Sequence, residues 1–223
     1  MTTYETELIS LDIEGLSIDI ERVTNIDALF AELIEKGENH PDFKDERIPY
    51  WAELWPSAFA LSQYLVASKI DFEGKKILEI GAGLGLPSIV AAKLGATVCV
   101  SDYLSEAVDF SRKNFKKNNL AANFQILDWR TPDDSFAADI VLAADVAYEK
   151  RMFEYLPLAF KTFCKPNGTI YLSEPNRGLA QYFLQDLHNQ GFRVEKIILP
   201  VTLFNIKHTI NVLKIKVSDF DGY

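Results

Sequence analysis

The chain has 223 residues, of which 48% are hydrophobic, and its 23 basic and 32 acidic residues give a formal net charge of −9. This length and composition predict one domain with a single substantial core and a modest extension. An acidic surface repels phosphate backbones and no apolar run approaches about 20 residues, so we expect a cytoplasmic protein that binds neither nucleic acid nor a membrane.

The N-terminal region predicts a small unit of its own. Polar and apolar residues alternate over 8–13 and 16–20 on either side of a Glu-Gly pair, which predicts a β-hairpin. Apolar residues at helical spacing over 27–36 predict a helix, and the polar stretch 38–47 predicts a loop. The expected units are an N-terminal extension, a main domain and a tail, at residues 1–48, 49–217 and 218–223.

The main domain begins with a cluster of aromatic residues and then alternates strands with helices. A helix is predicted over 58–67, after Pro56. Strands are predicted near 76–80, 97–101, 123–127, 139–143 and 168–173, and helices near 86–93, 104–118, 150–164 and 177–190. The last two strands, 192–199 and 207–217, are joined by a segment too short for a helical crossover, which predicts an antiparallel pair. We therefore expect an α/β fold, with a doubly wound, seven-stranded, mostly parallel sheet whose last strand is antiparallel.

A glycine-rich turn follows the first strand of this domain. Gly81, Gly83 and Gly85 alternate with other residues directly after the strand that contains Glu79. Because glycine lacks a Cβ, such a turn lets a ligand lie against the main chain. Asp102 ends the next apolar run, at the place where an acid holds ribose hydroxyls in nucleotide-binding α/β folds. The pattern indicates an adenosine-containing ligand.

The glycine spacing and the local charge narrow the ligand further. A dinucleotide fingerprint would need glycine where the chain has Leu86, and the Gly-Lys-Ser/Thr of a phosphate-binding loop is missing. No Lys or Arg lies between residues 77 and 92, so the turn favours a ligand with a positive centre and no phosphate. S-adenosylmethionine, an adenosine with a sulfonium and an amino-acid tail, fits this description. A purely structural turn is the alternative.

Several short motifs resemble those of class I S-adenosylmethionine-dependent methyltransferases. They are the Glu79–Gly85 turn, Asp102, Asp128-Trp129 and Asp145–Tyr148. More narrowly, the segment Tyr50–Ala58 (YWAELWPSA) and the Asp-x-x-Tyr element at Asp145 resemble the small non-histone protein-lysine methyltransferases, the group that includes the electron-transfer-flavoprotein β-subunit methyltransferase. The resemblance covers residues 50–217 and implies a Rossmann-like methyltransferase domain, S-adenosylmethionine as cofactor and a protein lysine as acceptor.

The resemblance assigns cofactor binding to Trp55, Glu79, Gly81, Gly83, Gly85, Asp102, Asp128, Trp129 and Ala144. Glu79 would face the methionine ammonium, and Asp102 would accept hydrogen bonds from both ribose hydroxyls. Asp128 would accept from the adenine amine, with Trp129 covering the base. The two acids at 79 and 102 are also compatible with helix capping, and Trp55 and Trp129 with packing.

The predicted catalytic residues are Asp145 and Tyr148, which follow the fourth strand of the main domain, where the crevice of a parallel sheet opens. Asp145 would hold and orient the acceptor amine, and Tyr148 would shape or polarise its slot. A helix N-cap is the alternative for Asp145, and Arg177 is compatible with lining the cleft, capping or pairing at the surface. The rest of the predicted substrate cleft is Glu53, Glu174 and Asn176.

These observations predict an S-adenosylmethionine-dependent methyltransferase that acts on a lysine of a protein. Carboxylates around the cleft of an acidic protein favour a cationic acceptor over a phosphate-rich one. A small-molecule amine methyltransferase and a non-catalytic cofactor-binding partner are the alternatives, and the second would not need Asp145 and Tyr148. The three histidines are scattered, so no metal site is predicted. Cys99 lies in an apolar, strand-like run and Cys164 near the end of a helical pattern, which indicates reduced packing residues.

Overall fold

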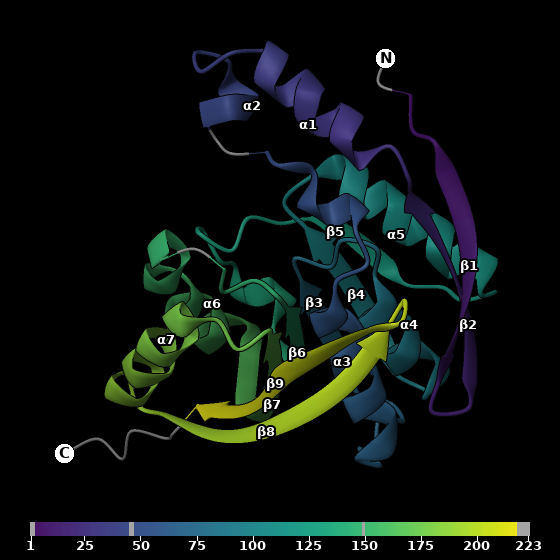
Figure 1. Cartoon of the computed structure of the whole chain (residues 1–223). Coiled ribbons are helices and arrows are strands. Elements are labelled where there is room, and N and C mark those ends of the chain that lie inside the picture. The colour runs from purple at the N-terminus through teal and green to yellow at the C-terminus, as the bar shows by residue number, and fades with distance from the viewer. Residues whose placement is uncertain (1–2, 45–46, 149, 218–223) are drawn as a thin grey trace.

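The computed structural model describes residues 3–44, 47–148 and 150–217. A seven-stranded sheet with the order β5-β4-β3-β6-β7-β9-β8 forms its centre, and a two-stranded sheet, β1-β2, lies to one side against helix α5 (Figure 1). Strands β3 to β7 are parallel, whereas β9 is antiparallel to both of its neighbours. The predicted doubly wound sheet with an antiparallel last strand is confirmed.

The elements follow the predicted alternation closely. The strands are β1 Thr6–Ile13, β2 Leu16–Val23, β3 Lys76–Ile80, β4 Thr97–Asp102, β5 Asn123–Ile126, β6 Ala138–Ala144, β7 Cys164–Glu174, β8 Phe192–Leu203 and β9 Ile206–Val217. The α-helices are α1 Ile26–Glu35, α2 Pro41–Lys44, α3 Pro56–Ala67, α4 Leu86–Lys93, α5 Ser105–Lys117, α6 Leu156–Phe163 and α7 Gly178–Asn189. Three short 3₁₀ helices are η1 Pro49–Ala52, η2 Asp134–Phe136 and η3 Lys150–Glu154.

The N-terminal hairpin and helix α1 are confirmed, and one local prediction there was wrong. Glu14 and Gly15 form the hairpin turn with φ of 52° and 88°, the left-handed pair of a two-residue hairpin turn. The predicted loop 38–47 contains the helical turn α2, which starts at Pro41. Proline fits the first position of a helix, but a single turn is too short to produce a helical periodicity that a sequence pattern can reveal.

Two further boundaries differ from the predictions. The helix predicted over 150–164 is divided into η3 and α6, because Pro157 sits in the first turn of α6 and proline is tolerated only there. Cys164, placed near the end of that helix by its pattern, instead begins β7. The expected connection 200–206 is mostly strand: β8 and β9 meet at a two-residue turn, Phe204-Asn205, with φ of 50° and 64°.

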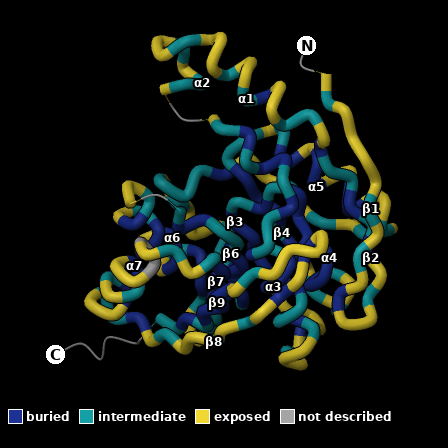
Figure 2. Tube along the Cα trace, in the orientation of Figure 1, coloured by how far each residue is buried: buried dark blue, intermediate teal, exposed yellow. Residues whose placement is uncertain are grey.

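Helices cover both faces of the central sheet, and each face has its own apolar core. Helices α3, α4 and α5 pack on one face, and α6 and α7 pack on the other. The most buried segments run along the central strands, with exposed residues on the outer helices and the N-terminal hairpin (Figure 2). Within the part of the chain that the structure describes, no helix combines the length and apolar character needed to cross a bilayer. The carboxyl ends of β3, β4 and β6 meet at one edge, which therefore positions the loops that follow them.

Candidate active site

A cavity of about 430 Å³ lies at this edge of the sheet, a size typical of small-molecule sites. Most of the residues predicted to form the site line it: Glu53, Trp55, Gly81, Gly83, Gly85, Asp102, Asp128, Trp129, Ala144, Asp145 and Tyr148. These residues come from five separate stretches of the chain. The fold therefore brings the glycine-rich turn, the acids that follow β4 and β5, and the Asp145–Tyr148 segment around one space.

The glycine-rich turn needs its glycines for backbone and packing reasons. Gly81, Gly83 and Gly85 have φ of 62°, 54° and 79°, in the left-handed region that glycine adopts without strain. A Cβ at Gly81 would lie 2.9 Å from Val146 Cγ1 and 3.0 Å from Trp129 Cζ3. Sequence reasoning assigned these glycines to contact with a ligand. The structure adds that neighbouring protein atoms already exclude a side chain at Gly81.

Asp102 links the glycine-rich turn to the turn after β4. Its Oδ2 accepts from the backbone N–H of Gly83 and its Oδ1 from that of Leu104, each at 3.0 Å. Burial raises the pKa of Asp102, and these hydrogen bonds oppose the rise. Asp102 is not the N-cap of α5, which is Leu104. Each carboxylate oxygen can accept a second hydrogen bond, so Asp102 can brace the loop and still receive donors from the cavity.

Of the two interpretations of Glu79, contact with the cofactor and helix capping, the structure shows the capping arrangement. Its carboxylate is fully buried, and Oε2 accepts from the backbone N–H of Ser88 at 3.0 Å, in the first turn of α4. Oε1 has no partner among the described residues. Burial raises the pKa of Glu79 to about 8, and the negative charge of Asp102 contributes to the rise. Glu79 lies beneath the turn and does not line the cavity.

Arginines that sequence reasoning left unassigned line the cavity beside Asp128. Arg130 donates to both Asp128 oxygens: Nε lies 2.9 Å from Oδ1 and from Oδ2, and Nη2 lies 2.7 Å from Oδ2. Two guanidinium groups lie over the Tyr103 ring, with Arg130 Cζ 4.9 Å and Arg47 Cζ 5.4 Å from its centroid. Trp129 lines the cavity and also packs against the core on the α6 side, so its packing role is present, and its role in covering the adenine stays a prediction. The sequence signal for Arg130 was its position two residues after Asp128, an acid of the methyltransferase motifs.

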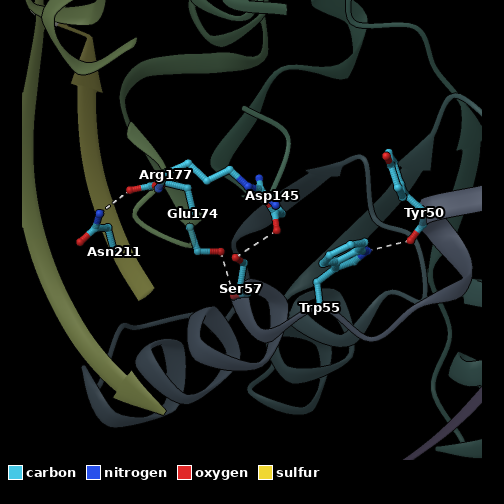
Figure 3. A network of polar contacts seen from close by, with 8 residues as sticks. Tyr50, Trp55, Ser57, Asp145, Glu174, Arg177 and Asn211 are labelled. Atoms are coloured by element: carbon cyan, nitrogen blue, oxygen red, sulfur yellow. Dashed lines mark hydrogen bonds and ion pairs between the residues drawn. The ribbon is translucent and has the colours of Figure 1, made fainter. Parts of the chain in front are cut away.

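Three aromatic side chains form one wall of the cavity. The Tyr50 ring meets the Trp55 ring edge-on at 5.8 Å between centroids and the Tyr148 ring at 5.6 Å. Trp55 Nε1 donates to the backbone oxygen of Tyr50 at 2.7 Å (Figure 3). Tyr50 was missed as a site residue, although its place in the aromatic cluster before α3 pointed to it. The wall connects the segment before α3 with the segment after β6.

Asp145 lies at the end of β6 with only 7% of its side chain exposed. Its Oδ1 pairs with Arg177 Nη1 at 2.5 Å, and the Ser57 hydroxyl lies 3.4 Å from Oδ2 (Figure 3). Burial raises the pKa of Asp145, whereas Arg177 and Ser57 lower it. Asp145 is not a helix N-cap, since η3 begins only at Lys150. Arg177 is the N-cap residue of α7, and its side chain pairs within the cavity rather than at the outer surface.

The remaining predicted cleft residues take different positions. Glu53 lines the cavity and pairs with Arg22 of the N-terminal hairpin at 3.4 Å. Arg22 also pairs with Glu7 at 2.7 Å, so the hairpin is tied to the cavity rim. Glu174 and Asn176 do not line the cavity. Glu174, the last residue of β7, is buried, whereas Asn176 follows the strand and is exposed, and both accept a hydrogen bond from Asn211 of β9. Across residues 3–44, 47–148 and 150–217 no group of three or more His, Cys, Asp or Glu side chains could hold a metal ion.

Comparisons with known proteins agree with this geometry. A family model for lysine methyltransferases matches residues 45–190. EEF1A lysine methyltransferase 3 of Mus musculus is 33% identical over 156 residues, 67% of this chain and 67% of that protein. The electron transfer flavoprotein beta subunit lysine methyltransferase of Danio rerio is 26% identical over 199 residues, 85% and 76% of the two chains. The histone-arginine methyltransferase METTL23 of Homo sapiens is 41% identical over 109 residues, 45% and 57%.

A solved structure supports the same fold. The T. thermophilus 16S rRNA methyltransferase RsmC, in complex with AdoMet and guanosine, matches 97% of this chain and 52% of its own with a TM-score of 0.66. At 15% sequence identity this likeness concerns the fold. The family match and the fold confirm the predicted Rossmann-like methyltransferase domain and its cofactor. The chain belongs to the lysine methyltransferase family and is an S-adenosylmethionine-dependent methyltransferase.

Proposed function

We propose that this protein methylates the side-chain amine of a lysine in a protein substrate and that it does so in the cavity described above. The observation that carries the proposal is that one cavity joins the Asp102 carboxylate and glycine-rich turn to the buried Asp145 carboxylate and the Tyr148 ring. A cofactor-binding half and an acceptor half are both needed for group transfer, and a binding module would not need the second.

The chemistry of the lining fits the cofactor. Asp102 keeps acceptor capacity for ribose hydroxyls, and the Trp129 ring, which lines the cavity, is the proposed cover for the adenine. Asp128, already held by Arg130, is the proposed acceptor for the adenine amine. The aromatic wall and the acids suit a positively charged sulfonium. S-adenosylmethionine, when bound, supplies a methyl group activated by that sulfonium.

The acceptor half has the groups that a nucleophilic amine requires. In the transfer, the amine lone pair forms the new N–C bond as the methyl–sulfur bond breaks, so the lysine must first lose a proton to water. We assign Asp145 to accept a hydrogen bond from the amine and orient its lone pair, and Tyr148 to limit the slot. Glu53, at the rim, adds negative charge that attracts the cationic form of the acceptor.

A protein arginine is the second candidate acceptor. The observation in its favour is the 41% identity to a histone-arginine methyltransferase, over 45% of this chain. The longer matches, to proteins named lysine methyltransferases, favour lysine.

We further propose a cytoplasmic location, because Cys99 and Cys164 are free thiols, as is usual in a reducing compartment.

Labelled methyl transfer tests the proposal directly. The protein is incubated with labelled S-adenosylmethionine and an extract of its source cells, and labelled proteins are mapped by mass spectrometry. Methyl-lysine on a protein is the expected product. Methyl-arginine would establish the second candidate instead, and label found only in small molecules would refute a protein acceptor.

Asp145→Asn and Tyr148→Phe test the assigned roles. Asparagine tolerates the left-handed φ of 56° at position 145, so the fold and the cofactor affinity should change little. We expect transfer to fall by about tenfold or more in Asp145→Asn, since the charge that orients the amine is lost. Asp139→Asn, at the opposite end of β6, is the matched control and should keep normal transfer. Normal transfer in both site variants would remove Asp145 and Tyr148 from the acceptor half.

A further inference from the structure

The backbone of Asp145 has a conformation that its neighbours must maintain. Its φ of 56° lies in the left-handed region, which aspartate tolerates but which is uncommon for residues other than glycine. Its backbone N–H donates to the oxygen of Ser173 at 2.8 Å, and its side chain is almost fully buried. The direction of the carboxylate is therefore determined by surrounding protein groups rather than by solvent.

Arg177 is the main polar partner of that carboxylate, and it is anchored from behind. The Arg177 backbone N–H donates to Glu174 Oε2 at 3.1 Å. Glu174 is 2% exposed and accepts through Oε1 from Asn211 Nδ2, on β9. Asn211 is 1% exposed and also donates to Asn176 Oδ1 at 3.0 Å. Buried polar groups from β7 and β9 thus hold the start of α7 so that the Arg177 side chain reaches Asp145 (Figure 3).

The two oxygens of Asp145 differ in how fully they are used. Oδ1 receives the short contact from Arg177. Oδ2 has the Ser57 hydroxyl at 3.4 Å, at the long end of the hydrogen-bond range. Asp145, Arg177 and Tyr148 all line the cavity. Oδ2 is therefore the oxygen with acceptor capacity left for another donor.

We propose that Arg177 is a positioning residue of the acceptor site, which binds Oδ1 of Asp145 and leaves Oδ2 to accept a hydrogen bond from the acceptor amine. The inference rests on the proposed function, because it concerns the acceptor half of the same cavity. A planar guanidinium that donates in a fixed direction is well suited to orient a carboxylate. The positive charge of Arg177 also lowers the pKa of Asp145 against the effect of burial, which favours the ionised carboxylate.

The groups around Asp145 determine how its ionisation responds to Arg177. Burial raises the pKa of Asp145, Arg177 and Ser57 lower it, and the charge of Glu174 raises it. Arg177 and Glu174 are the charged groups that act on it. The other charged or titratable side chains that line the same cavity are Arg47, Tyr50, Glu53, Asp102, Tyr103, Asp128, Arg130, Tyr148 and Arg151. The ionised carboxylate has two acceptor oxygens and no donor, whereas the protonated form carries an O–H group. Loss of the Arg177 charge should raise the pKa of Asp145, so the pH range in which the site is active should move to higher pH.

The test compares wild type with Arg177→Gln and Arg177→Lys, with Arg193→Gln on the exposed face of β8 as the control. For each protein, kcat/KM is measured against pH with the acceptor that wild type labels in the cell extract, and S-adenosylmethionine affinity is measured by calorimetry. We expect Arg177→Gln to move the acidic limb of the profile to higher pH and to lower kcat/KM by about tenfold or more below that limb. Arg177→Lys, which keeps the charge, should retain the wild-type limb, and cofactor affinity should stay within about twofold in all variants.

An acidic limb that coincides in wild type and a cofactor-binding Arg177→Gln variant would overturn the inference. Equal displacement in Arg177→Lys and Arg177→Gln would also overturn it, because the retained charge would then have no effect. If Arg177→Gln does not fold, Arg177→Met, which keeps the apolar stem, replaces it in the comparison.

Failure of the proposed function gives a different result. Wild type would then label no protein lysine at any pH. The Asp145 carboxyl would still titrate at higher pH in Arg177→Gln than in wild type, as measured by NMR of ¹³C-labelled aspartate in the cofactor-bound proteins. A carboxyl titration that is the same in both proteins would count against Arg177 whatever the acceptor.

Discussion

Asp102→Asn separates the two tasks that the structure gives to one carboxylate. In the free protein both Asp102 oxygens accept from backbone N–H groups, those of Gly83 and Leu104, each at 3.0 Å. Asparagine retains one oxygen and turns an NH₂ group toward the other donor. Loss of one charge-assisted hydrogen bond in a buried position should lower the free energy of unfolding by about 1.5–3 kcal/mol. Urea denaturation measures this change.

The same substitution should weaken cofactor binding. If Asp102 also accepts from the ribose hydroxyls, replacement of the carboxylate removes at least one further charge-assisted bond, again about 1.5–3 kcal/mol. That loss corresponds to an affinity lower by about ten- to hundredfold. Titration calorimetry with S-adenosylmethionine measures it on the folded fraction of the variant.

Asp139→Asn provides the matched control for this experiment. Asp139 also accepts from a backbone N–H, that of Lys76 at 2.8 Å, and pairs with Lys165 at 3.0 Å. It lies at the opposite end of β6, away from the cavity lining. We expect Asp139→Asn to lose about 1 kcal/mol of stability and to keep wild-type cofactor affinity. Unchanged affinity in Asp102→Asn, or an equal loss in both variants, would refute the assignment of Asp102 to the ribose.

Three further predictions follow from the site. The pKa of Glu79 is raised from 4.5 to about 8 in the folded state, so its contribution to stability is complete below the unfolded pKa and is lost as pH rises through about 8. In Glu79→Gln the urea midpoint should therefore depend less on pH between 4.5 and about 8 than in wild type, and an equal pH dependence in both proteins would contradict the reasoning. Gly81→Ala and Gly74→Ala both place alanine at positive φ, but only Gly81 is crowded, so Gly81→Ala should be less stable by about 1–3 kcal/mol, and equal melting temperatures would argue against this. Arg22→Ala should raise the acceptor KM without changing cofactor affinity, because Arg22 holds Glu53 at the rim. Steady-state kinetics that show an unchanged acceptor KM and a weaker cofactor affinity would exclude this role of Arg22.

Local patterns were sufficient for most of the elements. The predicted strand 76–80 and helix 86–93 coincide with β3 and α4, because the apolar run, the glycine turn and the proline of the first helical turn all lie within twelve consecutive residues. The hairpin at the N-terminus was equally predictable, since alternation and a left-handed Glu-Gly turn are local properties. The helix over 150–164 was not, because its apolar spacing continued across the start of α6.

The amino-acid sequence by itself determined the order of the elements, the family of the enzyme and many of the residues that line the cavity, because each of these depends on short segments with their own spacing rules. It did not determine how those residues pair. Asp145 meets Arg177 across 32 positions only because β6 and β7 are neighbours in the sheet, and Glu174 meets Asn211 only because β9 inserts beside β7. Such partnerships follow from strand order and register, which local periodicity does not encode, and they leave Asp145 buried and oriented by a residue that no short motif includes.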